Sequence, residues 1–357
     1  MEKALIAMSG GVDSSVAALL MSRKYECIGA NMRLYDNETV GTKEAKTCCS
    51  LDDAMDARRV ADKIGMPFYV LNFEEDFKEK VISNFVDCYQ KGMTPNPCID
   101  CNRFIKFEKF MLKARELGCS CIATGHYAKV EYDKESGRYL LKKARDTAKD
   151  QSYVLAHMTQ EQLAFARFPL GNMCKSETRA MAEKHGFANA KKHDSQDICF
   201  VPNGNYGDFI CTYTGEKAEE GYFTDPGGNI LGKHRGIWYY TIGQRKGLGI
   251  SSTKPYYVSK IDVKNNIVEV ADEAAVYGMR LRADHLNLIL VKDIEKPVRV
   301  KAKIRYRQAE QWATVKKTGE DEIEVEFDKP QRAITLGQTI VLYQGDCVFG
   351  AGIISKK

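Results

Sequence analysis

The sequence predicts an α/β fold: an N-terminal parallel sheet, a small central domain and a C-terminal antiparallel β-barrel. Over the N-terminal third, buried-type strands alternate with amphipathic helices, the pattern of a parallel sheet with helices on both faces. After residue 200, glycines, aromatic residues and short extended runs replace the helical periodicity, and from Val298 apolar and basic residues alternate. A chain of 357 residues accommodates two or three domains. We expect them at residues 1–200, 201–278 and 279–357.

The N-terminal elements follow from local periodicity. Ala54, Ala57 and Ala61 recur at three- and four-residue spacing, which predicts an amphipathic helix over residues 51–64 that is closed by Gly65. Helical composition also marks residues 14–24, 76–90 and 104–117. Short apolar runs predict buried strands over residues 3–8, 27–34, 68–73 and 121–124.

Composition excludes several classes of protein. Apolar residues make up 44% of the chain and charged residues 28%, which matches a globular protein and neither a disordered nor a fibrous one. No apolar run approaches the roughly 18 residues of a membrane helix, and we recognise no signal peptide. We therefore expect a cytoplasmic protein that does not contact a membrane. The net charge of +5 is only weak evidence for an anionic partner.

A glycine-rich loop, Ser9-Gly10-Gly11-Val12-Asp13-Ser14-Ser15, follows the first strand and opens a helix. Glycines let the backbone approach an anion, and the unpaired N–H groups and dipole of a helix N-terminus favour negative charge there. The loop lacks the Lys-Ser/Thr ending of a Walker A motif. It resembles the loop of ATP pyrophosphatases, which cleave ATP between the α and β phosphates and transfer AMP to a substrate oxygen.

This resemblance implies ATP and Mg²⁺ as cofactors. Asp13 is then a magnesium-binding or loop-ordering carboxylate, and the alternative is a simple helix cap. Met32 and Gly125 follow strands, at the edge where open α/β sheets place their ligands. The ATP-binding residues that the resemblance implies are Ala7, Met8, Ser9, Gly10, Gly11, Val12, Asp13, Ser14, Met32 and Gly125.

Two sites stand out among the twelve cysteines. Cys98 and Cys101 follow a proline-stiffened segment directly before a predicted helix start, where nearby Arg103 and Lys106 favour a reactive thiolate. Cys199 lies in an Asp-Ser-Gln-Asp-Ile-Cys-Phe segment at the expected domain junction. We expect most of the other cysteines to be inert core thiols.

Several motifs together resemble the ordered motif set of tRNA-specific 2-thiouridylases over nearly the whole chain. This resemblance implies adenylation of O2 of the wobble uridine and its replacement by sulfur, which yields 2-thiouridine, AMP and pyrophosphate. Cys199 would carry a persulfide, and Cys101 would be the nucleophile that helps to release its sulfur, with a disulfide between the two in each turnover. The implied partners are tRNA and a sulfur donor, either a cysteine desulfurase or a relay protein. The motifs are residues 9–15, 96–102, 123–127, 149–153, 195–200 and 240–248.

Cys98 is a departure from this family, because many members carry an aspartate at its position. The resulting Cys-x-x-Cys spacing also suits metal or iron–sulfur ligation. Cys98, Cys101 and Cys199 would then hold a [4Fe-4S] cluster with one iron open to carry sulfide. A four-cysteine zinc site that uses Cys48-Cys49 is less favoured. The persulfide and cluster routes both remain open at this point.

A run of basic residues predicts an RNA-facing surface. Arg299, Lys301, Lys303, Arg305 and Arg307 would fall on one strand face roughly 7 Å apart, which matches successive phosphates. The alternative is a solvated face. A small-molecule synthetase or amidotransferase, the main rival function, would need neither this strand nor the cysteine pair. The family resemblance implies tRNA or target-base contacts by Asn96, Pro97, Cys98, His126, Lys149, Asp150, Gln151, Arg305, Tyr306 and Gln338.

Overall fold

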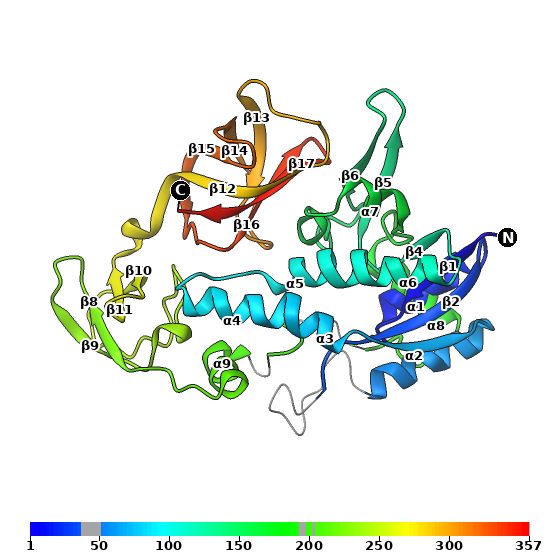
Figure 1. The fold of residues 1–357 in the computed structure, drawn as a ribbon, viewed down its shortest axis with the longest axis horizontal. Coiled ribbons are helices and arrows are strands. Elements are labelled where there is room, and N and C mark those ends of the chain that lie inside the picture. The colour runs from blue at the N-terminus through cyan, green and yellow to red at the C-terminus, as the bar shows by residue number, and fades with distance from the viewer. Residues whose placement is uncertain (37–50, 193–197, 202–203, 357) are drawn as a thin grey trace.

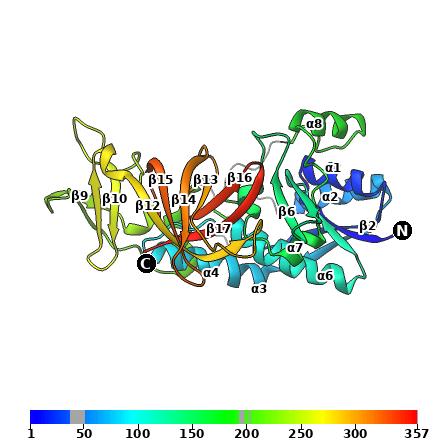
Figure 2. The same cartoon turned by 90° about the horizontal axis from the view of Figure 1, so that it is seen from above.

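A computed structural model describes residues 1–36, 51–192, 198–201 and 204–356 of the protein. The parallel sheet lies at one end of the molecule, a small mixed sheet lies at the other, and the barrel lies between them (Figure 1). Two long helical segments run beneath the barrel from one end toward the other. The view from above shows the same order of the three parts (Figure 2).

The N-terminal sheet is parallel, with helices on both faces as predicted, although its edge strand β3 (Phe68–Asn72) is largely exposed. Its central strand is hydrophobic on both sides: Leu5 and Ala7 pack into one apolar cluster, whereas Ala4 and Ile6 pack into another. A parallel sheet requires this, because each crossover helix covers one of its faces. The strands are ordered β3-β2-β1-β4-β7, with β1 (Lys3–Ala7), β2 (Glu26–Arg33), β3 (Phe68–Asn72), β4 (Cys121–Ala123) and β7 (Ala166–Arg167).

The helices divide between the two faces. On one face lie α1 (Val12–Met21), α2 (Leu51–Ile64) and α8 (Lys175–Lys184). The other face carries α7 (Gln160–Phe165) and two continuous helical segments, residues 74–90 and 97–116. These segments are α3 (Glu74–Phe77), η1 (Lys78–Ile82) and α4 (Ser83–Gln90), then α5 (Pro97–Asp100), η2 (Cys101–Lys109) and α6 (Phe110–Glu116); η1 and η2 are π-helical.

The second long helix begins earlier than the sequence predicted. It starts at Pro97, not at residue 104, because proline suits the first helical position, where its missing N–H costs nothing. Cys98 and Cys101 therefore lie inside the first turns of this helix, and not in a loop before it.

The C-terminal strands form the predicted antiparallel barrel. Val300, Ala302, Val315, Val325 and Phe327 alternate into its interior. The strands run β12-β15-β14-β13-β16-β17, and pairing of β12 with β17 closes the ring. They are β12 (Tyr277–Leu288), β13 (Val298–Lys303), β14 (Gln311–Lys317), β15 (Ile323–Arg332), β16 (Thr339–Gln344) and β17 (Cys347–Ser355).

A hairpin from the N-terminal region joins this barrel. Strands β5 (Ala128–Asp133) and β6 (Arg138–Lys143) were not predicted, and β6 extends the sheet by pairing with β17 at Cys347↔Lys142. The backbone N–H of Lys143 also donates to the carbonyl of Asp346 at 2.9 Å. The ATP-pyrophosphatase-like region and the barrel therefore share one sheet.

The central region contains a four-stranded mixed sheet and a helix. Its strand order is β10-β11-β8-β9, with β8 and β11 parallel. Phe209 of α9 (Tyr206–Thr214) packs on Phe85 of α4, which attaches this region to the long helix. The domain boundaries at residues 200 and 278 stay predictions. Among the described helices, none is long and apolar enough to cross a membrane. The other elements are β8 (Gly221–Thr224), β9 (Ile230–His234), β10 (Tyr257–Asp262), β11 (Ile267–Ala271), η3 (Ser152–Leu155), η5 (Ile237–Tyr239) and η6 (Glu273–Val276).

Candidate active site

The glycine-rich loop connects β1 to α1, and its backbone requires glycine. Gly10 has a φ of +73°, and a Cβ atom there would lie 2.3 Å from the carbonyl oxygen of Asp53. Gly11 occupies the N-cap position of α1 and has no side chain that could cap the helix. The N–H groups of the first helical turn therefore have no capping side chain, which suits an anion.

Two polar side chains hold the loop in shape. Ser14 Oγ accepts a hydrogen bond from the N–H of Ser9 at 3.2 Å and donates to the carbonyl of Gly11 at 3.0 Å. Asn189 is buried, and its Nδ2 donates to the carbonyl of Gly10 and to Ser15 Oγ, both at 2.9 Å. The sequence offered no signal for Asn189, because only the folded chain brings it to the loop. The loop is thus preformed.

The other predicted ATP residues lie at the same sheet edge. Met8 is buried, and its carbonyl accepts a hydrogen bond from Asn31 Nδ2 at 2.9 Å. Asn31 directly precedes Met32 on β2. A Cβ atom on Gly125 would lie 2.7 Å from the backbone nitrogen of Ser14, so Gly125 passes directly over the first turn of α1. The structure therefore brings Met32 and Gly125 to the edge that carries the loop.

Asp13 is held by two groups that the sequence did not single out. Its carboxylate accepts hydrogen bonds from Lys175 Nζ at 2.8 Å to each oxygen and from the Tyr127 hydroxyl at 2.9 Å. The Lys175 side chain is only 11% exposed. Asp13 is thus more than a helix cap, because it fixes a cation beside the loop. No local motif marks Lys175, which is the first residue of α8.

The surroundings of Asp13 also bear on magnesium. Mg²⁺ is usually held by one or two carboxylates together with substrate phosphates and water. Three hydrogen bonds use most of the roughly four acceptor positions of the Asp13 carboxylate. Within the described ranges, no group of three or more His, Cys, Asp or Glu side chains is arranged to hold a metal ion. The residues present fit a metal carried mainly by the nucleotide.

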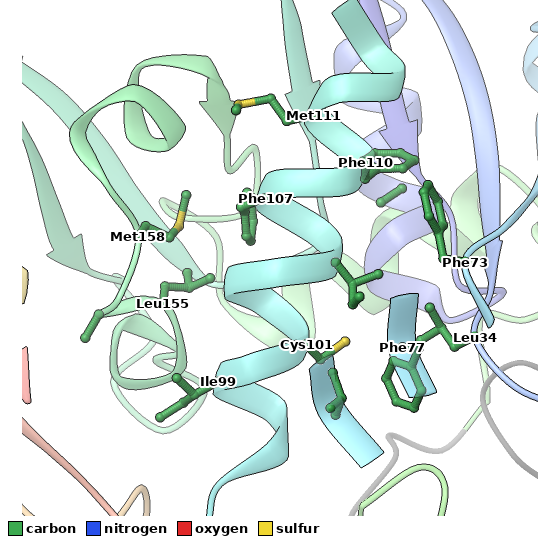
Figure 3. Packing of buried hydrophobic residues seen from close by; sticks show 14 of the residues in the cluster. Leu34, Phe73, Phe77, Ile99, Cys101, Phe107, Phe110, Met111, Leu155 and Met158 are labelled. Carbon is green, nitrogen blue, oxygen red and sulfur yellow. The ribbon is translucent and has the colours of Figure 1, made fainter. Parts of the chain in front are cut away.

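Cys101 and Cys199 belong to one apolar cluster. Cys101, at the start of η2, is 8% exposed, and its sulfur points to the side of the helix where Phe77 lies (Figure 3). Cys199 is half-buried and packs on the same cluster, and its carbonyl accepts a hydrogen bond from the Tyr35 hydroxyl at 2.6 Å. Cys98, one turn before Cys101, is exposed. The predicted pair therefore shares a cluster to which Cys98 does not belong.

An aspartate between the two helix cysteines has an altered acidity. Burial raises the pKa of Asp100 to about 6, while a 2.8 Å hydrogen bond from Asn84 and the charge of Arg103 act in the opposite direction. A carboxyl group that changes charge near neutral pH thus adjoins Cys101. The π-helical stretch that begins at Cys101 is a second unusual feature, because such helices are often found at functional sites.

All three regions meet at the segment that leads into Cys98. Gln338 Nε2 of the barrel donates to the carbonyl of Thr94 at 2.7 Å and to that of Pro95 at 3.1 Å. From the central region, Thr241 forms a 3.2 Å hydrogen bond with the Thr94 hydroxyl. Asn96 is the N-cap of the cysteine helix, and the buried Pro97 is its first residue. The predicted base-bordering segment is therefore fixed from two sides.

The predicted tRNA loop at residues 149–151 lies between the barrel and the phosphate loop. Tyr306 donates its hydroxyl to the carbonyl of Asp150 at 3.0 Å. Gln151 Oε1 accepts the N–H of Tyr127 at 2.9 Å, and Tyr127 in turn binds Asp13. Lys149 adjoins this pair, and its N–H donates to the carbonyl of Asp146 at 3.1 Å. Tyr127 therefore links Gln151, which is expected to contact tRNA, to Asp13, which is expected to contact ATP.

His126 and Arg305 are more enclosed than RNA contacts usually are. His126 is buried between Phe107 and Phe168, and burial lowers its pKa well below the usual value, so the ring is neutral. Arg305 donates to the carbonyl of Ile242 at 3.1 Å and to Thr335 Oγ1 at 2.8 Å. Both side chains support the site walls, and their contact with tRNA stays a prediction.

The expectation of five basic residues on one strand face is wrong in part. β13 ends at Lys303, and Arg305 and Arg307 lie beyond it, because the chain leaves the barrel wall there. Arg299, Lys301 and Lys303 remain on the outward face. The predicted RNA-facing strand is therefore shorter and carries three cations.

Comparisons with known proteins agree with this architecture. Family models match residues 2–203 (tRNA methyl transferase HUP domain), 207–272 (tRNA methyl transferase PRC-barrel domain) and 279–354 (aminomethyltransferase beta-barrel domain). The "tRNA-specific 2-thiouridylase MnmA" of Clostridioides difficile is 51% identical over 357 residues, which are 100% of this chain and 99% of that protein. The protein of the same name from Acetivibrio thermocellus is 51% identical over 355 residues, 99% of each chain. The chain therefore belongs to the tRNA-specific 2-thiouridylase family.

Proposed function

We propose that this protein is an ATP-dependent tRNA-uridine 2-sulfurtransferase, which replaces O2 of the wobble uridine with sulfur. One connected set of contacts carries the proposal. Asp13 of the phosphate loop binds Tyr127, whose N–H donates to Gln151 at the start of η3. At 3.0 Å, the carbonyl of Val154 in η3 accepts a hydrogen bond from Asn102, the neighbour of Cys101. This chain of contacts links the nucleotide loop to the sulfur-handling helix and supports their acting together as one site.

The first step of the proposed mechanism is adenylation of the uridine. O2 attacks the α-phosphorus of ATP, the bond to the bridging oxygen breaks, and pyrophosphate leaves. The N–H groups at the start of α1 and the ammonium of Lys175 neutralise the negative charge that develops on the phosphates. When bound, Mg²⁺ would be carried mainly by the nucleotide phosphates, with the remaining acceptor position of Asp13 available to it, and would supply further charge neutralisation.

The second step transfers sulfur from a persulfide on Cys199. The Cys101 thiolate attacks Cys199 Sγ, the persulfide S–S bond breaks, and the terminal sulfur leaves as hydrosulfide. Hydrosulfide attacks C2 of the uridine, and AMP departs with the former O2. This leaves a Cys101–Cys199 disulfide, which an external dithiol must reduce. A cysteine desulfurase or a relay protein then reloads Cys199.

The persulfide route fits the packing better than an iron–sulfur cluster does. Cys101 and Cys199 share a cluster, whereas Cys98 is exposed on the same helix. The three thiols of Cys98, Cys101 and Cys199 do not form a metal-binding group in the described structure. The cluster is the alternative outcome that a Cys98→Ala variant tests. Because its substrate is tRNA, we place the enzyme in the cytoplasm.

Release of AMP from ATP tests the proposed function against its rival. We expect AMP and pyrophosphate to be released only when tRNA with an unmodified wobble uridine is present, because that uridine supplies the attacking oxygen. tRNA with cytidine at the wobble position is the matched control. AMP release at the same rate without tRNA, in the presence of a small amide or carboxylate substrate, would instead favour a small-molecule synthetase.

The basic strand provides a test of tRNA binding. Lys301→Ala combined with Lys303→Ala is expected to weaken tRNA binding and to lower the slope of log affinity against log salt by about 1 to 2, because each neutralised phosphate releases counterions. Filter binding at several salt concentrations measures both quantities. Arg23→Ala with Lys24→Ala, two exposed cations beyond the far end of α1, is the control and should bind normally. Equal affinities and slopes for the two pairs would reduce the strand to a solvated surface.

A further inference from the structure

We infer that Trp312 is a stacking platform for an unpaired base of tRNA near the target uridine. The inference rests on the proposed function and adds a binding residue to it. Trp312 lies on β14, on the outer face of the barrel, and is 50% exposed. A single exposed apolar side chain is common on protein surfaces, so exposure alone carries little weight. The residues around Trp312 distinguish it from such isolated side chains.

Two cations flank the indole ring. Lys301 is directly opposite Trp312 in the β13–β14 register, and its Nζ lies 5.5 Å from the ring centroid. The guanidinium of Arg299 lies at the same distance, and hydrogen bonds of 2.8 and 2.7 Å to Asp328 fix it. Lys301 makes no ion pair with any other described residue. Its ammonium can therefore pair with an RNA phosphate.

The ring also lies at one end of a line of cations and aromatic rings. Lys303 follows Lys301 on the same face of β13, roughly 7 Å away. Its ammonium lies 5.8 Å from the Tyr306 ring, and Tyr306 binds the carbonyl of Asp150. Burial raises the pKa of the Tyr306 hydroxyl, and the nearby charges of Asp150 and, to a smaller extent, Cys98 act in the same direction. The line thus leads from Trp312 to the helix that carries the cysteines.

This arrangement fits single-stranded RNA. Proteins bind unpaired strands with aromatic rings that stack on bases and cations that meet phosphates, at intervals of about one nucleotide. An acidic peptide would use the lysines but would have no need of an indole face. Bases in a duplex are already stacked on one another, so the base that meets Trp312 must be unpaired. The nucleotides beside the wobble uridine meet this requirement, since the anticodon loop is single-stranded.

The chain contains only two tryptophans, which allows a direct measurement. In a Trp238→Phe background, Trp312 is the only source of tryptophan fluorescence. We expect its emission to be quenched when tRNA is added and to become protected from acrylamide. A mixture of free nucleoside monophosphates at equal base concentration should produce neither change.

Substitutions separate stacking from charge. Trp312→Ala should weaken tRNA binding about tenfold at every salt concentration and leave the salt slope unchanged, because stacking releases no counterions. Trp312→Tyr should restore most of the affinity. Tyr277→Ala removes another exposed aromatic ring of the same barrel, 45% exposed on β12, and should bind as the wild type does.

The inference is overturned if tRNA leaves the Trp312 emission unchanged and Trp312→Ala binds as tightly as Tyr277→Ala. Wild-type AMP release that still depends on tRNA would, in that case, leave the proposed function standing. A loss of affinity in Trp312→Ala that Trp312→Tyr fails to restore would also count against stacking. Quenching, tenfold weaker binding and an unchanged salt slope together would support it.

Discussion

Replacing Cys199 or Cys101 with serine is expected to abolish tRNA thiolation and the AMP release that accompanies it, while the pyrophosphate release of the adenylation step continues. The adenylation step uses the phosphate loop and the uridine oxygen, and neither cysteine touches those atoms in the proposed mechanism. Without a Cys199 persulfide no sulfur is delivered, and without the Cys101 thiolate the persulfide bond does not break. The measurement is 2-thiouridine formation, with pyrophosphate release assayed in parallel as the readout of adenylation. Cys211→Ala, a half-buried cysteine in α9, is the control and should thiolate normally.

Cys98→Ala decides how the sulfur is held. In the persulfide route Cys98 is dispensable, and anaerobically purified protein without iron thiolates tRNA at the wild-type rate. A Cys101–Cys199 disulfide should then appear after one turnover without reductant, which requires their Cα atoms to come within about 7 Å. In the cluster route, Cys98→Ala costs as much as Cys101→Ala, and the protein binds about four irons. An inactive Cys98→Ala protein together with an iron-dependent wild type would therefore exclude the disulfide cycle.

Loss of the Asp13 charge is expected to lower the rate of AMP release at least about a hundredfold. Asp13 positions the Lys175 ammonium beside the phosphate loop, and preorganised charges of this kind typically contribute that much to a rate. Pyrophosphate release from Asp13→Asn, at saturating ATP and tRNA, measures the effect. Asp52→Ala removes an exposed carboxylate from the first turn of α2 and is the control, with activity near that of the wild type.

Because Asp13 pairs with Lys175, the thermal stability of the Asp13 variant must be measured together with its activity. Asp13→Asn alone leaves a largely buried ammonium without its counterion, which destabilises the fold. Asp13→Asn combined with Lys175→Met removes both charges, so thermal stability should recover while AMP release stays low. If the double variant regained activity together with stability, Asp13 would have only a structural role.

Elements fixed by local periodicity were predictable, and those that depend on distant partners were not. The helix over residues 51–64 and strands β1 to β4 of the parallel sheet follow from residues that are neighbours in the sequence, whereas the two-residue strand β7 was not predicted. The β5–β6 hairpin was missed although Ala128, Val130 and Tyr132 alternate with polar residues, and its partner strand β17 lies about two hundred residues later. Lys175 and Asn189 reach the phosphate loop only because α8 and the segment after it pack beside α1.

The basic strand β13 shows a second limit of prediction from sequence periodicity, which concerns the end of a strand. The alternation of Val298, Val300, Ala302 and Ile304 predicted where apolar side chains would enter the barrel, and the last three of them are buried there. The same alternation could not indicate where the strand ends. A turn after Lys303 takes Arg305 from the outer face to the backbone carbonyl of Ile242 in the central region. The functional cysteines could be predicted from motifs, and the strands from periodicity, because both signals lie within a short stretch of sequence.

The sheet shared by the hairpin and the barrel has a consequence for biosynthesis. Strand β6 pairs with β17, which is synthesised about two hundred residues later. The apolar cluster around Cys101 is also completed by barrel residues such as Val341, Tyr343 and Val348. A nascent chain that stops short of them exposes a sheet edge and an incomplete core, both of which promote aggregation. The sulfur-handling cysteines therefore become enclosed only after β16 and β17 have been synthesised, and a chain that lacks these strands has no finished active site.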